Sequence, residues 1–367
     1  MSFTVLSGPD IENVFNHLTS DEVAGLIKAL EEALIQYSTQ NEKQYQPHRS
    51  VVTRPGGQNS LFMPATTNQV IGVKIVGISP SRDPSALPPG TKPPPGLKSV
   101  LTLCDASGQA IGVLNAAELT AFRTALGSML LYRLRQNTEN IVVFGAGKQA
   151  LWHIRLAVLL RAQDIRAITI VNRSIQRTEE LVDTLTNSPG WPSHVNIKAF
   201  GSNDDLENLV VSADVIFCTT PSTRPLFPAD ILKSETGRSK TRFISAIGSY
   251  RLDMAEIDPE LLKAVTDQSS VFSSQVWNGL VTVDTSEGCL EEAGELVKAG
   301  ITASQMLEVG HIQHVLATSS SPDFGKWLKS GFVIYKSVGI GVMDLAIGQH
   351  LLQLASENGI GMSTQTF

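Results

Sequence analysis

The sequence predicts an α/β protein in which a parallel sheet occupies the middle of the chain. Two observations support this fold class. From Ile141 onward, short apolar strands alternate with helical segments, the pattern of a parallel sheet with right-handed crossovers. The first strand runs directly into a glycine-rich turn, and a helical pattern follows. The expected strands are residues 141–144, 167–171, 195–199, 214–218 and 242–246.

Length and composition exclude several classes of protein. The chain has 367 residues, which suggests about two domains of roughly 150 residues each. Hydrophobic residues make up 42% and charged residues 17%, so disorder over most of the chain is not expected. The net charge is −6 and no dense Lys/Arg block occurs, which argues against a nucleic-acid partner. No apolar run is long enough for a membrane span.

Further features indicate a cytoplasmic protein without a metal site. The N-terminal residues lack a basic segment followed by an apolar one, so no signal peptide is expected. Cys104, Cys218 and Cys289 are too few and too scattered for a disulfide framework or a zinc site, which favours a reducing compartment. His311 and His314 are three residues apart on an expected helix, but no third ligand accompanies them, so we interpret them as surface histidines.

The first 78 residues combine helices with short strands. Apolar residues recur at helical spacing from Asp10 to Tyr37, and Thr19 with Glu22 forms a capping-box pattern for a second helix in this stretch. Gly56-Gly57 predicts a turn between two of the strands. The expected strands are residues 2–6, 50–53, 60–63 and 69–76.

A proline-rich segment and a hairpin follow. Seven prolines among the sixteen residues Pro80–Pro95 exclude a helix or a central strand, so we expect a long loop, either functional or a plain solvent-exposed insertion. Residues 99–104 and 110–114 flank Asp105-Ala-Ser-Gly108 and predict a β-hairpin. The remaining expected elements are a helix over Ala116–Arg135, mainly helical structure after about residue 300 with an apolar piece at Phe332–Tyr335, and a last helix over Val342–Leu354.

The turn after the first strand of the parallel sheet carries the sharpest local signal. It reads Gly145-Ala146-Gly147-Lys-Gln149-Ala150, a Gly-x-Gly-x-x-Ala pattern. Gly145 permits the tight turn, Gly147 lets a pyrophosphate approach the backbone, and Ala150 allows the helix to pack close to the strand. The N–H groups at the start of the helix then face the phosphates. This order predicts a dinucleotide-binding unit.

The residues that follow two later strands indicate which nicotinamide cofactor to expect. An NAD site usually has Asp or Glu after its second strand, where the carboxylate holds the ribose 2′-hydroxyl. Here Asn172-Arg173 occupies that position and Arg177 follows one turn later. A 2′-phosphate suits these arginines, so NADPH is favoured over NADH, with a merely solvated arginine as the alternative. Thr219 and Thr220 follow the fourth strand, and their hydroxyls are candidates to face the cofactor.

Three cations in the first part of the chain are candidates for substrate binding. Lys74 interrupts an apolar run, and Arg123 lies among small and apolar residues. Charges in such surroundings are costly unless they are paired, and a substrate carboxylate is a suitable partner. Arg49 joins them as a third candidate. Each of the three alone also fits an ordinary surface charge.

Ordered motifs extend along nearly the whole chain. They are Pro47-x-Arg49, Met63-Pro-Ala, Lys74 ten residues after Pro64, Leu119-Thr-x-x-Arg123-Thr-Ala125, Gly145-Ala-Gly-x-Gln-Ala150, Ala246-Ile-Gly248-Ser with Glu256-Ile-Asp258, Glu292-Ala-Gly294-Glu, and Tyr335-Lys336-Ser-Val-Gly339 with Asp344. In this order they resemble the ornithine cyclodeaminase/μ-crystallin family. The resemblance implies a Rossmann NAD(P)-binding domain over residues 125–339, inserted in an α+β substrate-binding and dimerisation domain of residues 1–124 plus 340–367.

The resemblance also implies roles for individual residues. Arg49, Lys74 and Arg123 would hold a substrate α-carboxylate against the nicotinamide, and Lys74 would also take part in proton transfer. Gly248, Ser337 and Gly339 would lie near the cofactor, and the protein would form a homodimer. Activities in the family include ornithine cyclodeamination, alanine dehydrogenation and the reduction of cyclic ketimines or related imines, and μ-crystallin also binds thyroid hormone.

Two positions depart from the cyclodeaminase pattern. Cyclodeaminases carry an aspartate in the segment after Gly248 and a glutamate three residues before the proline of the Met-Pro motif. Here the two positions hold Tyr250 and Leu61, so both carboxylates suited to a diamino acid are missing. Tyr250 is left either to donate a hydrogen bond or to shape the pocket.

These departures favour an NADPH-dependent reductase acting on a cyclic or open-chain imine of an α-keto acid. The catalytic candidates are Lys74, Arg123 and Tyr250. Two alternatives remain. One is a cyclodeaminase-type lyase that recycles bound NAD, and the other is a non-catalytic NADPH-bound protein that binds a small ligand, as μ-crystallin does.

Overall fold

The structure is a computed structural model and describes residues 3–78, 97–201, 205–319 and 321–365. It divides into two compact units. Unit 1 comprises Met1–Arg123 and Ile340–Phe367, and unit 2 comprises Thr124–Gly339. The expected loop Pro80–Pro95 lies outside the described residues.

Unit 1 is built on a seven-stranded mixed sheet, called sheet A, with the order β15-β1-β6-β5-β4-β3-β2. β1 is parallel to β6, and the other neighbouring strands are antiparallel. The predicted hairpin is confirmed, and Gly108 in its turn has a φ of 90°. The strands are β1 (Phe3–Leu6), β2 (Ser50–Thr53), β3 (Asn59–Thr66), β4 (Val70–Ile78), β5 (Leu97–Asp105), β6 (Ala110–Asn115) and β15 (Met362–Thr364).

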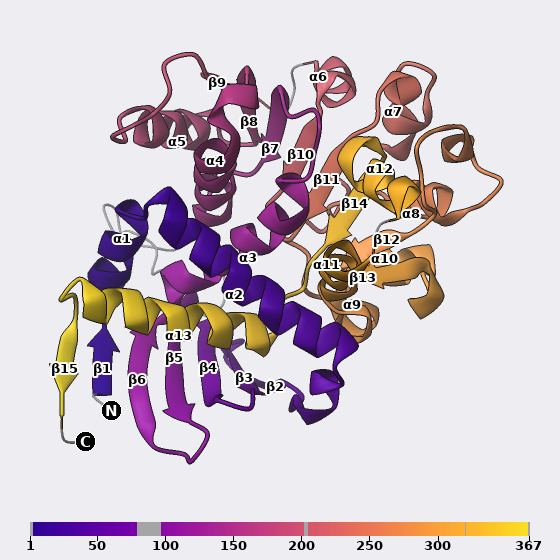
Figure 1. The fold of residues 1–367 in the computed structure, drawn as a ribbon. Helices are drawn as coiled ribbons and strands as arrows, with labels where there is room; N and C mark the ends of the chain where they lie inside the picture. The colour runs from indigo at the N-terminus through magenta and orange to yellow at the C-terminus, as the bar shows by residue number, and fades with distance from the viewer. Residues whose placement is uncertain (1–2, 79–96, 202–204, 320, 366–367) are drawn as a thin grey trace. The chain divides into compact units, whose positions relative to one another are not determined.

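Helices cover one face of sheet A. α2 and α13 lie side by side over the strands (Figure 1). The predicted capping box is confirmed, since the Thr19 hydroxyl accepts a hydrogen bond from the Glu22 N–H and the Glu22 carboxylate accepts one from the Thr19 N–H. The helices of this part are α1 (Gly8–Asn16), α2 (Ser20–Thr39), α13 (Gly341–Glu357) and α3 (Ala116–Tyr132), which runs across the unit boundary.

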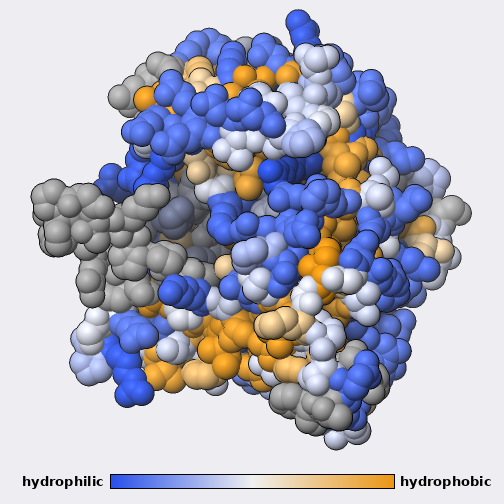
Figure 2. Space-filling view, turned by 90° about the vertical axis from the view of Figure 1, so that its left-hand side faces the viewer, coloured by the Kyte–Doolittle hydropathy of each residue, from blue (hydrophilic) through white to orange (hydrophobic). Residues whose placement is uncertain are grey.

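The other face of sheet A exposes apolar side chains. Side chains alternate along β4, so Lys74 belongs to the buried set while Ile71 and Ile75 point away and are 40% and 38% exposed. Phe62 on β3 and Val52 on β2, which share this face, are also exposed. Figure 2 shows hydrophobic surface in the lower part of its view, the level at which Figure 1 draws sheet A. These exposed apolar side chains gather on one face of sheet A and are not scattered singly over the surface.

Unit 2 is built on an eight-stranded sheet, called sheet B, with the order β13-β12-β14-β11-β10-β7-β8-β9. All its strand pairs are parallel, so the predicted parallel sheet is confirmed. The strands are β7 (Asn140–Phe144), β8 (Ala167–Asn172), β9 (Asn196–Gly201), β10 (Val215–Cys218), β11 (Phe243–Ala246), β12 (Val281–Val283), β13 (Met306–Glu308) and β14 (Val333–Lys336).

Short helices connect these strands. They are α4 (Lys148–Arg161), α5 (Ile175–Thr186), α6 (Leu206–Ser212), α7 (Ala229–Lys233), α8 (Pro259–Thr266), α9 (Ser286–Glu292), α10 (Gly294–Ala299), α11 (Val309–Thr318) and α12 (Pro322–Ser330). The four residues of β10 and the four of β11 are all buried, as expected for central strands of a parallel sheet. No helix in the described part of the chain is long and apolar enough to cross a membrane.

Several element boundaries differ from the sequence expectation. β12, β13 and β15 were not expected, because three residues are too few for a readable periodicity, and β13 lies in a region predicted to be mainly helical. The prediction that α3 extends to Arg135 is wrong. The helix ends at Tyr132, where the chain tightens into a turn and the Arg135 guanidinium donates to the carbonyls of Leu328 and Gly331.

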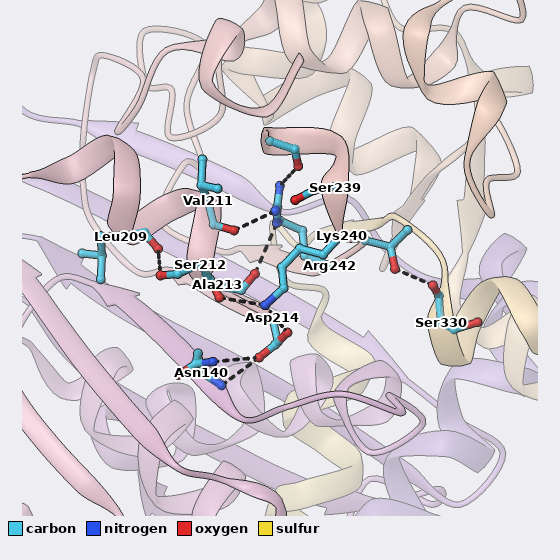
Figure 3. Close-up of polar contacts among 12 residues, drawn as sticks. Asn140, Leu209, Val211, Ser212, Ala213, Asp214, Ser239, Lys240, Arg242 and Ser330 are labelled. Atoms are coloured by element: carbon cyan, nitrogen blue, oxygen red, sulfur yellow. Dashed lines mark hydrogen bonds and ion pairs between the residues drawn. The ribbon is translucent and has the colours of Figure 1, made fainter. Parts of the chain in front are cut away.

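The amino-terminal edge of sheet B is held by a buried polar network (Figure 3). Arg242, directly before β11, is fully buried and donates to three backbone carbonyls within residues 211–237. Asp214, directly before β10, accepts from the N–H and side chain of Asn140 and, at 2.7 Å, from Lys240 Nζ. The network thus ties together the starts of β7, β10 and β11.

Candidate functional site

The glycine-rich turn between β7 and α4 leaves room for a ligand. Gly145 has a φ of 113°, and a Cβ there would lie 2.7 Å from Thr219 Oγ1, so only glycine fits. Gly147 is the N-cap of α4, and no side chain caps the helix. A Cβ on Gly147 would meet nothing within 4 Å among the described residues. The backbone at Gly147, where α4 begins, is therefore not covered by a side chain of the described residues.

The donor set at this turn fits a phosphate-bearing ligand. N–H groups at the start of a 14-residue helix favour an anion through hydrogen bonds and the helix dipole. The Gln149 side-chain oxygen is buried and accepts no hydrogen bond from the described residues. Ala146 is half-buried, and Ala150 is fully buried, as close packing of helix and strand requires. An orphaned polar atom beside uncapped N–H groups is a feature that a bound dinucleotide would relieve.

The end of β8 presents two cations to solvent. Arg173 and Arg177 are exposed, and neither guanidinium has a hydrogen bond or ion pair among the described residues. The Asn172 amide donates to the carbonyl of Ser174, and the Ser174 hydroxyl caps α5 by accepting from the Arg177 N–H. The turn is thus held by short-range bonds, while both arginine heads remain available to an anion.

The hydroxyls of Thr219 and Thr220 are engaged by the protein itself. Thr219 Oγ1 donates to the carbonyl of Phe144 at 2.7 Å. Thr220 Oγ1 donates to Glu256, and the same carboxylate accepts from the Gly248 N–H at 2.6 Å. The ends of β10 and β11 are therefore bound to each other through Glu256, and these hydroxyls fix the edge of the sheet.

A second carboxylate organises the segment after β14. Asp284 is fully buried and accepts from Ser337 Oγ at 2.7 Å, from the Gly339 N–H at 2.7 Å and from the Val338 N–H at 3.1 Å. Gly339 has a φ of 84°, a conformation that favours glycine. Ser337 and Gly339 are thus held in place by Asp284, a residue to which the sequence analysis assigned no role.

Tyr250 lies after β11 in unit 2 and is half-buried. Its ring lies 5.9 Å from the guanidinium of Arg251, and its hydroxyl makes no hydrogen bond with the described residues. Both roles left open for this phenol, hydrogen-bond donor or pocket wall, are compatible with that position.

In unit 1, Lys74 and Arg123 meet at one buried carboxylate. Lys74 Nζ donates to Asp344 Oδ2 at 2.7 Å, and Arg123 Nε donates to Asp344 Oδ1 at 3.0 Å. All three residues are almost fully buried. Close packing brings them together, since a Cβ on Gly72 would lie 2.5 Å from Leu345, so α13 lies directly on β4.

The cluster carries an excess of positive charge. Burial lowers the pKa of Lys74 to about 8, the Asp344 carboxylate opposes this shift, and the charges of Arg123 and Arg49 add to it. Arg49 is half-buried and close enough for its charge to act on Lys74. Lys74 and Arg123 around the single carboxylate of Asp344 leave a net positive site, which suits a carboxylate ligand.

The donor atoms of the cluster also favour a carboxylate ligand. Arg123 Nη1 has only a weak contact to Met343 Sδ at 3.8 Å, and Nη2 has no hydrogen bond among the described residues. Leu61 lies on β3, two residues from Met63, which pairs with Lys74, so Leu61 belongs to the same face of sheet A. Leu61 is therefore an apolar side chain on the face of Lys74, at the position where cyclodeaminases carry the glutamate suited to a second amine.

Sequence reasoning did not include Asp344 in the site, although it is the centre of the cluster. Lys74 and Asp344 are 270 residues apart, so no local spacing links them. The available signal was an acidic residue in the otherwise apolar start of the last helix, where an unpaired charge is costly.

The fold defines a class of α/β protein with an all-parallel Rossmann-like sheet and a second, mixed sheet. Residues 10–358 match the Ornithine cyclodeaminase/mu-crystallin family, and the chain belongs to this family. The resemblance that the motifs indicated is thereby confirmed.

Several relatives have reductase names, and one from Dictyostelium discoideum, 28% identical, is named a cyclodeaminase. The Delta(1)-pyrroline-2-carboxylate reductase of Bacillus cereus is 25% identical, with 94% of this chain and 98% of that protein aligned. The ketimine reductase mu-crystallin of Macropus fuliginosus is 24% identical, with 91% of this chain and 92% of that protein aligned.

Two solved structures share the fold. The Thermococcus litoralis Delta(1)-pyrroline-2-carboxylate reductase in complex with NADH and L-proline has a TM-score of 0.74 and 18% identity, covering 98% of this chain and 100% of that one. An archaeal alanine dehydrogenase dimer with bound NAD has a TM-score of 0.74 and 19% identity, covering 100% of both chains.

Proposed function

We propose that the chain is an NADPH-dependent reductase of a carboxylate-bearing imine, cyclic or open-chain, which it converts into an amino acid. The observation that carries this proposal is the buried cluster in which Lys74 and Arg123 share Asp344. A buried site with more cations than carboxylates, and with free guanidinium donors, is matched by a substrate carboxylate. The reductases among the relatives support the reaction class.

Unit 2 is the proposed dinucleotide-binding domain, and unit 1 the proposed substrate-binding domain. The turn at Gly145 and Gly147 and the N-terminus of α4 would hold the pyrophosphate, and Arg173 and Arg177 would hold the 2′-phosphate of NADPH. When bound, the cofactor supplies the hydride that the imine carbon accepts. The NADH in the Thermococcus litoralis enzyme supports a nicotinamide cofactor, and the two arginines support the phosphorylated form.

The chain's own cations orient the substrate and supply its proton. Arg123 and Arg49 bind the carboxylate, which fixes the position of the neighbouring C=N bond. Reduction of that bond consumes one hydride at carbon and one proton at nitrogen. Lys74, whose pKa lies at about 8, gives up its proton more readily than an ordinary lysine and recovers one from water.

Ornithine cyclodeamination, the other activity in the family's description, has less support. Leu61 on the face that carries Lys74 offers no acceptor to a second amine, and Tyr250 stands where cyclodeaminases have an aspartate. A cationic side chain would find neither carboxylate.

A homodimer is the proposed assembly. The uncovered face of sheet A presents Val52, Phe62, Ile71 and Ile75, an apolar surface that a second copy would bury. The dimer of the archaeal alanine dehydrogenase supports this assembly.

The test measures the loss of NADPH absorbance when the protein is given candidate substrates. The panel contains cyclic ketimine carboxylates and mixtures of a keto acid with an amine. Imine-dependent NADPH loss by the wild type supports the proposal. An Arg123→Ala variant should lose that activity while still binding NADPH, and Arg166→Ala, at an exposed arginine of unit 2, serves as the matched control. Tight NADPH binding without turnover would instead indicate a binding protein. Ammonia release from L-ornithine with NAD would indicate a cyclodeaminase.

A further inference from the structure

A buried glutamate joins the carboxyl ends of β10 and β11. Glu256 Oε1 accepts from the Thr220 N–H at 2.6 Å and from Thr220 Oγ1 at 2.9 Å, and Oε2 accepts from the Gly248 N–H at 2.6 Å. A Cβ on Gly248 would lie 1.9 Å from the Thr220 carbonyl oxygen, so the two strand ends are in direct contact. One carboxylate therefore sets the geometry of two segments at the edge of the sheet that binds ligands in open α/β folds.

Two further charges lie against this edge. Lys336, the last residue of β14, is buried and donates to the Ser249 carbonyl at 2.6 Å. Its Nζ lies 3.3 Å from Oε1 of Glu295, a buried residue of α10. Neither carboxylate oxygen of Glu295 accepts a hydrogen bond from the described residues. Lys336 thus fixes the backbone directly before Tyr250.

The charges of this group do not balance. With all groups ionised, two carboxylates face one ammonium, and a buried net charge is costly. Burial raises the pKa of Glu256 to about 7, Lys336 opposes the rise, and Glu295 adds to it. A clamp that served stability alone would gain nothing from the second carboxylate.

We propose that Glu256, Lys336 and Glu295 form a positioning cluster that sets the cofactor-facing ends of β10 and β11 and couples the gain of one proton to the affinity for the nicotinamide cofactor. The inference rests on the proposed function, because it assumes that the carboxyl edge of sheet B holds the cofactor. None of the three side chains is assigned a contact with the reacting atoms. They act through Thr220, Gly248 and the Ser249 carbonyl.

Protonation changes the bonds that Glu256 makes. All three of its partners donate in the ionised state, and only the Thr220 hydroxyl is able to reverse and accept. Oε1 of Glu256 then carries the proton, so the hydrogen bond from the Thr220 N–H to Oε1 weakens. We expect the affinity for NADPH to fall by up to about tenfold as Glu256 gains a proton, the equivalent of one charged hydrogen bond.

The other titratable groups near Glu256 do not explain such a change. Burial raises the pKa of the Cys218 thiol on β10 and of the Cys289 thiol on α9, so both stay neutral near pH 7. Asp284, at the end of β12, is already saturated with donors from the segment after β14. The pKa of Glu256, about 7, lies where the gain of a proton would change cofactor binding.

Glu256→Gln is the principal test variant. The amide keeps the size of the side chain, but its nitrogen is a donor, so either the Thr220 donors or the Gly248 N–H lose their acceptor. Asp214→Asn is the matched control, because Asp214 is a buried carboxylate with several donors at the opposite edge of the same sheet. The readouts are the Kd for NADPH and for NADH by nucleotide fluorescence, and amide hydrogen exchange of the cofactor-free protein.

The positioning cluster predicts a distinct pattern. Glu256→Gln should raise the Kd about tenfold and speed exchange of the Thr220 and Gly248 amides, whereas Asp214→Asn should speed exchange near Asn140 and leave the Kd unchanged. The Kd for NADPH, measured over a pH series, should change around a midpoint that reports the pKa of Glu256. Lys336 lowers that pKa, so Lys336→Met should move the midpoint to higher pH. Glu295 raises it, so Glu295→Gln should move the midpoint to lower pH. A purely structural role would give no such opposite shifts.

Other results would overturn the inference. If the wild type binds cofactor and the Kd of Glu256→Gln is unchanged, or if Lys336→Met and Glu295→Gln shift the midpoint in the same direction, the positioning role is wrong and the proposed function stands. If the wild type binds neither NADPH nor NADH, the proposed function itself is wrong, and the positioning role with it.

Discussion

The amino-terminal edge of sheet B and the cluster on sheet A each bury an arginine and an aspartate, but the donors of the two arginines have different partners. All three guanidinium nitrogens of Arg242 donate to backbone carbonyls. Arg123, equally buried, bonds its Nε to Asp344 and has no hydrogen bond at Nη2 among the described residues. Each nitrogen of the Arg242 guanidinium thus has a partner within the fold, while Nη2 of Arg123 has none among the described residues.

This difference separates a structural charge from a binding charge. A buried cation whose donors are all satisfied stabilises the fold, and its removal leaves carbonyls without partners. A buried cation with free donors has lost its contacts with water without gaining enough hydrogen bonds in return, and a ligand is able to supply the missing hydrogen bonds. The same substitution should therefore damage stability in one cluster and function in the other.

The largest expected effect is on turnover by Arg123→Met. Methionine retains length and apolar contact but cannot bind a carboxylate. We expect kcat/KM for the imine to fall about thousandfold, or ~4 kcal/mol, the usual loss when one partner of a buried charge pair is truncated. The Kd for NADPH should change less than twofold. A variant that lost cofactor binding in parallel would contradict the assignment of Arg123 to the substrate.

The reciprocal substitution is Arg242→Met. Three carbonyls lose their donor, so the free energy of unfolding should fall by about 3 kcal/mol. Urea denaturation measures the loss, and the Kd for NADPH of the protein that remains folded should match the wild type. If kcat/KM fell as steeply as in Arg123→Met, the distinction between the two clusters would not hold.

Local signals explain what was predictable in these regions. The alternation of strands and helices, the hairpin around Gly108 and the capping box at Thr19 each depend on a few adjacent residues, and each is confirmed. The turn at Gly145 is equally local, since its φ of 113° demands glycine. Lys74 and Arg123 are charges within apolar surroundings, which is also a local signal, and the structure buries both of them.

The organising carboxylates were not predictable in the same way. Asp344 meets Lys74 across 270 residues, and Asp284 meets Gly339 across 55. Both contacts exist only because sheets bring distant strands and helices together. Sequence patterns report what a residue's neighbours in the chain require, whereas these acids satisfy donors from distant elements. The three-residue strands β12 and β13 could not be predicted for a related reason. They are defined by pairing with neighbouring strands and not by a periodic pattern within their own residues.

A third prediction concerns Asp344→Asn, which removes the charge shared by the two cations. We expect kcat/KM to fall about thirtyfold at pH 7, since about 2 kcal/mol of charged hydrogen bonding that orients both donors is lost. The pKa of Lys74 is about 8 and Asp344 raises it, so its removal lowers that pKa further. Activity that needs the Lys74 ammonium is present below its pKa and lost above it, so the alkaline limb of the pH–rate profile should move to lower pH. An unmoved limb would show that Lys74 is not the titrating group.

The smallest effect expected is on cofactor choice. Arg173 is exposed and unpaired among the described residues, so its contact with a 2′-phosphate would be screened by water and worth about 1.4 kcal/mol, or tenfold in affinity. Arg173→Ala should raise the Kd for NADPH about tenfold and leave the Kd for NADH unchanged, as measured by nucleotide fluorescence at low and high salt. Arg173→Lys should retain part of the preference, because it keeps the charge but not the bidentate geometry. An equal loss for both nucleotides would mean that Arg173 supports the turn after β8 and does not read the phosphate, and the preference for NADPH would then have to come from Arg177 or be absent.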